Sequence, residues 1–314
     1  MEALGQGMPR ANRIHFAHAI YHVINRGNYR APVFSEVGAA KAFETCLFEA
    51  ASLHHWKIHA FVIMRNHFHL AVETPEANLA EGTHWLSSTY ATRFNRFREE
   101  RGHVFQGRYY AGLVQAGPSL LRVVNYIHLN PVRAGLAEAE SLSDYRWSSL
   151  RYFLRGNRPT SLSCVDWLAE LQLPDKKASW QTYHRLLTQL ASEPARQKQD
   201  SFEQMDHSWA IGDMAWRREL AARFKSEGAA EPICGPERNA LRAERWNETL
   251  TQALTRLALD RTDLERARKG ADWKIQLAAE LRRTCGANYT WLARELKMGK
   301  AGSVRALLSR RTLN

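Results

Sequence analysis

Cysteine is scarce in this sequence: only four stand among 314 residues, and no two are spaced as a CxxC pair. This scarcity argues against a disulfide framework and against a zinc site built on thiolates. The sequence also has no run of roughly 20 apolar residues, which a membrane-spanning helix would need. Its first residues lack the apolar core of a secretion signal. We therefore expect a cytoplasmic protein with no membrane partner.

Acidic residues are few relative to basic ones, with 32 Asp and Glu against 44 Lys and Arg, a net charge of +12. Most of the basic residues are arginine, whose planar guanidinium suits phosphate groups better than the point charge of lysine. A basic protein gains affinity for a polyanion because each neutralised phosphate releases condensed counterions. The charge favours a nucleic-acid partner without establishing one.

The first half of the chain alternates strand and helix patterns. Short β-rich runs bounded by turn residues predict strands, and apolar positions at helical spacing predict the helices between them. Two helices that cross between antiparallel strands are typical of the ferredoxin-like α+β fold, a sheet with helices on one face, and we expect the hairpin strands at its centre. The predicted order is strand 19–24, helix 36–54, strand 58–64, strand 67–74, helix 79–100, strand 110–115 and helix 119–130.

The rest of the chain is mostly helical in pattern. Residues 156–270 read as a helical extension or linker, because polar connectors separate short amphipathic stretches and charges alternate densely. Residues 271–314 have the outline of a helix-turn-helix with a basic last helix, which predicts a DNA-binding segment that contacts duplex DNA. A small helical packing module is the alternative. The predicted boundaries are therefore 14–155, 156–270 and 271–314.

His67 and His69 flank Phe68 in a predicted strand. Side chains two residues apart point to the same face of a strand, so both imidazoles project together, about 7 Å apart. Two such imidazoles chelate one divalent ion if a third ligand arrives from elsewhere. The chain has 13 histidines, and spacing alone favours the simpler alternative of two histidines on a solvated sheet face.

Tyr126 and Asn130 lie four residues apart in a predicted helix and so share one face. The amide oxygen of Asn130 is an acceptable ligand for Mg²⁺ or Mn²⁺. The hydroxyl of Tyr126 needs activation to act as a nucleophile, which a phosphate polarised by a nearby metal supplies. Taken by itself, Tyr126 is better explained as an ordinary helix tyrosine. His128 is rotated about 200° from Tyr126, so we expect it to face solvent or DNA.

Several segments together resemble the single-tyrosine HUH transposases, in particular the REP-associated tyrosine transposases of bacteria. The resemblance covers residues 14 to about 155, and its motifs occur in the family's order. Linked motifs at family spacing are more specific than any one of them. The matching segments are FVIMRNHFHL at 61–70, FQGRY at 105–109, YIHLNPVRAG at 126–135 and YRWSS at 145–149.

The resemblance implies a function and a set of roles. His67, His69 and Asn130 would bind the divalent metal, Mg²⁺ or Mn²⁺, and Tyr126 would attack a phosphate of single-stranded DNA. That attack leaves a 5′-phosphotyrosine and a free 3′-hydroxyl, and its reversal against another end rejoins strands without ATP. The family cuts near the feet of palindromic hairpins, and the protein would then be associated with the bacterial nucleoid. Four arginines near the motifs are expected to contact DNA phosphates, with solvated surface positions as the alternative: Arg65, Arg108, Arg122 and Arg133.

Three readings of the function stay open. The first is the metal-dependent DNA endonuclease and strand transferase. The second is a hairpin-binding or other DNA-binding regulator of the same fold that does not cut. The third is a plain hydrolase that uses a metal on His67 and His69 to activate water. The resemblance is compatible with a monomer and with a homodimer that exchanges the tyrosine helix.

Overall fold

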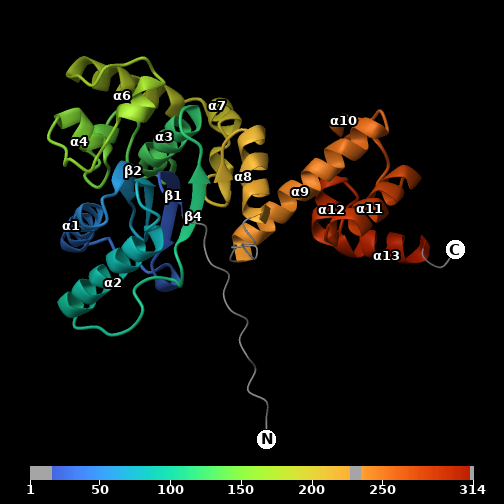
Figure 1. Cartoon of the computed structure of the whole chain (residues 1–314), viewed down its shortest axis with the longest axis horizontal. Coiled ribbons are helices and arrows are strands. Elements are labelled where there is room, and N and C mark those ends of the chain that lie inside the picture. The colour runs from blue at the N-terminus through green and yellow to red at the C-terminus, as the bar shows by residue number, and fades with distance from the viewer. Residues whose placement is uncertain (1–15, 227–234, 312–314) are drawn as a thin grey trace, which may run out of the picture. The chain divides into compact units, whose positions relative to one another are not determined.

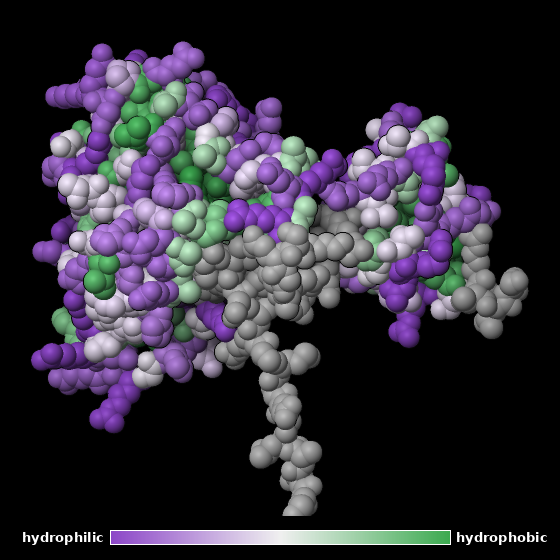
Figure 2. Space-filling view, in the orientation of Figure 1, coloured by the Kyte–Doolittle hydropathy of each residue, from purple (hydrophilic) through white to green (hydrophobic). Residues whose placement is uncertain are grey.

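The computed structural model describes residues 16–226 and 235–311 (Figure 1). The chain divides into two compact units, the first ending at Pro232 and the second beginning at Ile233. Helices beyond residue 155 thus belong partly to the first unit and partly to the second. The three functional segments expected from the sequence stay a prediction. Figure 2 shows a mainly hydrophilic surface on the visible face, and no helix of the described ranges is long and apolar enough to cross a membrane.

A five-stranded sheet in the order β2-β3-β1-β4-β5 forms the centre of the first unit. The first four strands pair antiparallel in the ferredoxin-like order, which confirms the predicted fold class. The expectation that both hairpin strands lie at the centre is wrong for β2, because the crossover through α2 places β4 beside β1 and leaves β2 at the edge. The strands are β1 (Ala19–Arg26), β2 (Lys57–Ile63), β3 (His67–Thr74), β4 (Tyr110–Val114) and β5 (Ala210–Ile211), the last of which runs parallel to β4.

Helices cover both faces of this sheet, so the expectation of helices on one face is wrong in that respect. On one face, Phe43 of α1 (Val37–Leu53) contacts Phe68 of β3 with ring centroids 4.6 Å apart, and α2 (Leu79–Arg98) adds Tyr90 to the same aromatic core. On the other face lies α3 (Pro118–Arg133), whose Tyr126 contacts His69. Alternation along β3 therefore separates an apolar core from a polar face, and α3 makes a second layer there.

An extension beyond α3 packs against that helix and completes the first unit. In this extension, α6 (Lys177–Ala191) contributes Trp180 and Tyr183 to a buried aromatic cluster. Its helices are α4 (Leu150–Arg155), α5 (Val165–Ala169), α6 (Lys177–Ala191), α7 (Pro194–Gln199) and α8 (Met214–Ser226), and the 3-10 turns of the unit are η1 (Asn28–Arg30), η2 (Leu142–Asp144) and η3 (Phe202–Gln204).

His128 shows what this extension does to α3. The expectation that it faces solvent or DNA is wrong: its side chain is fully buried and bonded to the Tyr183 hydroxyl at 2.9 Å and to Ser149 Oγ at 2.8 Å. His128 does point away from Tyr126, as the helical rotation predicted. However, α6 covers the face of α3 to which His128 points. His128 is therefore a structural residue that joins α3 to α6.

We expect His128 to make the metal-free protein sensitive to acid. Burial lowers its pKa from 6.5 to about 3, so the unfolded chain binds the proton first as the pH falls. The free energy of unfolding should then decrease below about pH 6.5 and down to about pH 3, by up to about 1.4 kcal/mol per pH unit from this group. Urea unfolding of wild type and His128→Gln at pH 7, 6 and 5 measures this, with a flatter pH dependence expected for the variant. Equal pH dependences would contradict the assignment.

The second unit is a bundle of helices around its own core. Trp246 of its first helix packs against Trp291, and the Asn288 side chain caps a later helix by accepting a 2.8 Å hydrogen bond from the Trp291 amide. The helix that precedes this capped helix ends at Gly286, which adopts a left-handed backbone conformation with φ 70°. These features agree with the predicted helix-turn-helix outline. The helices are α9 (Gly235–Arg256), α10 (Arg261–Arg266), α11 (Asp272–Cys285), α12 (Tyr289–Glu295) and α13 (Ala301–Arg311).

Candidate active site

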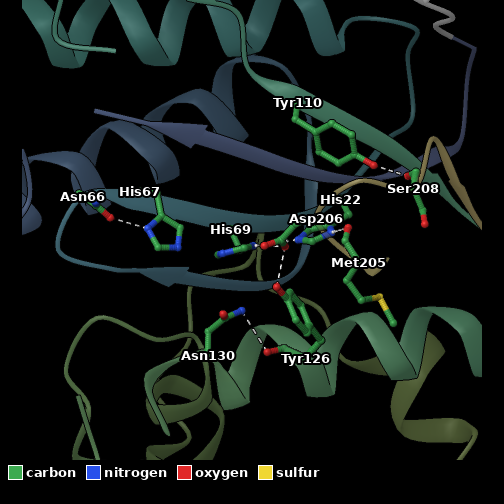
Figure 3. Close-up of polar contacts among 10 residues, drawn as sticks. All are labelled: His22, Asn66, His67, His69, Tyr110, Tyr126, Asn130, Met205, Asp206 and Ser208. Carbon is green, nitrogen blue, oxygen red and sulfur yellow. Dashed lines mark hydrogen bonds and ion pairs between the residues drawn. The ribbon is translucent and has the colours of Figure 1, made fainter. Parts of the chain in front are cut away.

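The polar face of β3 carries His67 and His69 side by side, with ring centroids 5.0 Å apart (Figure 3). Phe68 points to the opposite face, where it contacts Phe43. His69 is buried and His67 is half-buried. The two-residue spacing thus places the imidazoles as the alternation of a strand requires. The pair lies where α3 crosses the sheet.

A third histidine joins the pair from the neighbouring strand. His22 of β1 is fully buried, and its Nε2 lies 3.1 Å from Nδ1 of His69. Its own Nδ1 lies 3.1 Å from the carbonyl oxygen of Met205. His22 was not expected from the sequence, because only the register between β1 and β3 brings it beside His69. In that register His22 is opposite Ala71, which faces the same side as His69.

These contacts fix which nitrogen of each ring carries a proton. A carbonyl oxygen only accepts, so Nδ1 of His22 must donate to Met205, and its Nε2 accepts from Nδ1 of His69. Burial lowers the pKa of His22 to about 4, which keeps the ring neutral, and burial also places the pKa of His69 well below its usual value. His69 is left with a bare Nε2, and this buried atom has no hydrogen-bond partner in the described part of the chain.

His67 is oriented in the same way. Its Nδ1 lies 2.7 Å from Oδ1 of Asn66, which accepts, so its Nε2 also carries a lone pair. Burial, and then the charge of Arg26, lower the pKa of His67 to about 4. Metal-bound histidines commonly use one ring nitrogen for a hydrogen bond that orients the ring and offer the other to the ion. Both histidines of the pair have this arrangement.

Tyr126 of α3 faces the histidines. Its ring lies 5.6 Å from that of His69 and 5.8 Å from that of His22, and its hydroxyl donates a 2.5 Å hydrogen bond to Oδ1 of Asp206 (Figure 3). Burial and the Asp206 carboxylate raise the pKa of Tyr126, while Arg133, 4.7 Å from the ring centroid, lowers it. The hydroxyl is thus protonated at rest and already bonded to a proton acceptor.

Asp206 belongs to a segment in which no sequence motif indicated a site residue. The segment is held against the site at several points: Phe202 packs on the Tyr126 ring at 5.4 Å, the Tyr110 hydroxyl bonds the Ser208 carbonyl, and the Leu113 amide donates to the Trp209 carbonyl at 2.8 Å. The pairing of β5 with β4 continues this attachment. Asp206 is therefore part of a fixed wall of the site.

Two oxygen donors on other segments could complete a cation site at the histidines, and one of them, the Asp206 carboxylate, lies 3.7 Å from Nδ1 of His69. Among the described residues, His22, His69 and Asp206 each offer a ligand atom within 4.8 Å of the others. Asn130, the expected third ligand, lies one turn after Tyr126 and donates its amide N–H to the Tyr126 carbonyl at 3.1 Å (Figure 3). This bond leaves its Oδ1 as the atom available to an ion. The unpaired Nε2 of His69 beside a second imidazole fits a divalent metal that takes nitrogen ligands.

The four arginines expected to contact DNA lie at different places. Arg133 lies at the site, with its guanidinium group over the rings of Tyr126 and Phe202. Arg122 is half-buried on α3 and donates to Ser119 Oγ at 3.0 Å. Arg65, in the β2–β3 turn, and Arg108, before β4, are exposed. Contact of any of them with DNA stays a prediction.

Comparison with known proteins finds transposases similar to the first part of the chain. Residues 15–130 match the family model described as "Transposase IS200 like". A search of curated proteins finds no match. One similar solved structure is a REP-associated tyrosine transposase bound to a REP hairpin, 18% identical, covering 50% of this chain and 92% of that chain with a TM-score of 0.40. Another is a putative transposase from Deinococcus radiodurans R1, 18% identical, covering 42% and 92% with a TM-score of 0.28.

The matched segment contains His22, the pair His67 and His69, and Tyr126, whereas Asp206 lies 76 residues beyond its end. The site thus combines a family domain with a wall that the extension supplies. Residues 15–130 thus match the IS200-like transposases, in agreement with the resemblance to the single-tyrosine transposases that the sequence predicted.

Proposed function

We propose that this transposase is a metal-dependent endonuclease and strand transferase for single-stranded DNA, with Tyr126 as its nucleophile. The observation that carries the proposal is the bare Nε2 of His69, held in place by His22 and adjacent to both His67 and the Tyr126 ring. A plain solvated sheet face would not leave a buried nitrogen unpaired. The motifs shared with the REP-associated enzymes support hairpin DNA as the substrate.

His67 and His69 would hold the metal through Nε2, with Asn130 Oδ1 or the Asp206 carboxylate as an oxygen ligand. When bound, Mg²⁺ or Mn²⁺ polarises the scissile phosphate and offsets its developing charge. The protein's own contribution is to fix both rings, since His22 and Asn66 occupy the other nitrogens. Arg133 adds a positive charge on the Tyr126 side of the site.

The Tyr126 hydroxyl would attack the phosphorus, forming an Oη–P bond as the P–O3′ bond breaks. Asp206 accepts the tyrosine proton, for which it is already placed at 2.5 Å, and the leaving 3′-oxygen takes up a proton to become a hydroxyl. The phosphotyrosine retains the phosphodiester's bond energy, so attack by a 3′-hydroxyl rejoins strands without ATP. Burial of Tyr126 keeps water from competing with that hydroxyl.

Incubation of the full chain with a labelled palindromic hairpin and Mg²⁺ or Mn²⁺, followed by a denaturing gel, tests this function. We expect a covalent protein–DNA adduct and a shortened strand that ends in a 3′-hydroxyl. Tight hairpin binding with no adduct under either metal would instead support a regulator of the same fold. Tyr126 meets the histidines of its own chain, so we propose that a monomer is sufficient and expect adduct formation to be linear in protein concentration.

We propose a second DNA contact through the helix-turn-helix of the C-terminal unit. Val304 of α13 is buried, whereas Ser303, Arg305 and Ala306 in the first half of that helix are exposed, as is Lys300 just before it. The first residues of the second helix in such a motif contact base edges in the major groove, and nearby basic residues contact phosphates. This placement supports duplex DNA as the partner of this unit.

The double variant Lys300→Glu with Arg305→Glu should weaken binding of the full chain to a random-sequence 20-base-pair duplex by at least about tenfold. It should also flatten the salt dependence, because two phosphate contacts are lost. Fluorescence anisotropy between 50 and 200 mM salt measures both effects. The double variant Arg196→Glu with Lys198→Glu, on exposed positions of α7, makes the same charge change. Equal weakening by the two double variants would show that only net charge matters.

A further inference from the structure

A second cluster of potential ligands lies at the far end of the same sheet face. Its centre is His59, the extra residue at the point where the β2–β3 register shifts between Ile58 and Ala60. Bulges of this kind redirect a side chain and are frequently functional. The His59 side chain is fully buried, and neither of its ring nitrogens has a hydrogen-bond partner in the part of the chain described. A buried imidazole without partners requires an explanation.

Two carboxylates face this ring. Nε2 of His59 lies 3.5 Å from Oε2 of Glu73, and Nδ1 lies 3.9 Å from Oδ2 of Asp166. Glu73 is on β3, and Asp166 is in the first turn of α5, with its Oδ2 buried. The three residues each offer a ligand atom within 4.8 Å of the others. Glu73 is four residues along β3 from His69, or about 13 Å, so this cluster is separate from the active site.

A cation already contacts these oxygens. Nζ of Lys57 lies 2.6 Å from Oδ2 of Asp166 and 3.3 Å from Oε2 of Glu73, and its side chain is 34% exposed. The contact with His59 and then the charge of Lys57 lower the pKa of Glu73 to about 2, which keeps that carboxylate ionised. His18, largely exposed, lies 3.6 Å from the other Glu73 oxygen. Lys57 pairs with both carboxylates, while neither ring nitrogen of His59 makes a hydrogen bond within the described ranges.

We propose that His59, Glu73 and Asp166 form a second metal site for a divalent transition ion such as Zn²⁺, with Lys57 as the cation that the metal displaces. One imidazole nitrogen with two carboxylate oxygens is a ligand set that Zn²⁺ accepts. A tetrahedral ion with bonds of about 2.1 Å needs ligand atoms roughly 3.4 Å apart. The His59–Glu73 distance is near this value, and Asp166, 40% exposed, is at the surface where it can adjust.

Such an ion would join the transposase domain to its extension. Glu73 and His59 lie within residues 15–130, whereas Asp166 lies on α5 beyond them. The backbone already connects β2 to the segment before α5, since the Ser163 amide donates to the Ile58 carbonyl at 2.8 Å. The metal would strengthen this connection without entering the reaction. Zn²⁺ should therefore raise the Tm of the full chain through this cluster.

The test uses the full chain with His67→Ala and His69→Ala, which removes the metal site proposed for catalysis. Isothermal titration with Zn²⁺ should show one remaining equivalent, and Co²⁺ should give visible absorption bands. Asp166→Asn, at a half-exposed position, should weaken Zn²⁺ binding at least tenfold, and His59→Gln should abolish it. Lys57→Gln should strengthen it, because the competing ammonium is gone.

His55→Gln is the matched control, because His55 and Glu76 form an exposed histidine–carboxylate pair 3.2 Å apart. This variant should leave Zn²⁺ affinity unchanged. Absence of a remaining equivalent in the background variant would overturn the proposal. So would binding that Asp166→Asn leaves intact, or that Lys57→Gln weakens, since an ion-pair network alone predicts those results. Circular dichroism of each variant confirms that the fold is retained.

Discussion

Tyr126→Phe should eliminate the covalent protein–DNA adduct, with a decrease of at least about 10³-fold in strand cleavage. Phenylalanine keeps the ring that packs between His69 and Phe202 but has no oxygen to attack phosphorus. Hairpin affinity should stay within about threefold of wild type, because the substitution removes one hydroxyl that is bonded within the protein. The measurement is a denaturing gel with a labelled hairpin and Mn²⁺, beside a gel-shift titration.

Tyr29→Phe is the control for this result. Tyr29 is 92% exposed, so it is the kind of tyrosine that would react non-specifically, and its loss should leave the adduct unchanged. Chelation of metal by EDTA should eliminate the adduct of wild type as completely as Tyr126→Phe does. If cleavage continues in Tyr126→Phe with Mn²⁺ present, the reaction uses water, and the protein is a metal-dependent hydrolase.

Asp206→Asn should slow adduct formation by about 10²-fold or more. Asparagine has the same shape but a far weaker affinity for a proton, so the tyrosine loses its acceptor. The loss should appear in the single-turnover rate and not in hairpin affinity, since Asp206 contacts Tyr126 and His69. Quenched-flow or manual time courses with excess protein measure the rate. Glu203→Gln, an exposed carboxylate on the same segment, is the control.

The metal dependence of Asp206→Asn separates the roles open to this carboxylate. If Asp206 is only a proton acceptor, Asp206→Asn should leave the concentration of Mn²⁺ needed for half-maximal rate unchanged. If Asp206 is instead a metal ligand together with His22 and His69, Asp206→Asn should raise that concentration about tenfold or more. A rate that rises in Asp206→Asn would contradict both roles and would mean that the carboxylate obstructs the approach of the phosphate.

The sequence anticipated those features that depend on local spacing. The strand and helix order of the transposase domain, the shared face of His67 and His69, and the shared face of Tyr126 and Asn130 all follow from periods of 2 and 3.6 residues. The family motifs then joined these local patterns into one site. These features could be predicted because each of them depends on residues that lie close together in the sequence.

Features that depend on tertiary register were missed. His22 reaches His69 only through the pairing of β1 with β3, and Asp206 reaches Tyr126 across 80 residues. No short pattern marks either residue. His128 was misread for a related reason: helical geometry correctly turned it away from Tyr126, but the burial of that face by α6 is invisible in the helix's own sequence.

The attachment of β5 to β4 also sets how far the protein can be shortened. A chain that stops near residue 155 would keep every family motif but lose Met205, whose carbonyl fixes the proton of His22. It would also uncover the outer edge of β4, where the Leu113 and Gln115 amides now bond to the extension. Unpaired edge strands promote aggregation between molecules. The smallest soluble catalytic fragment should therefore extend through α8 and not end with the family domain.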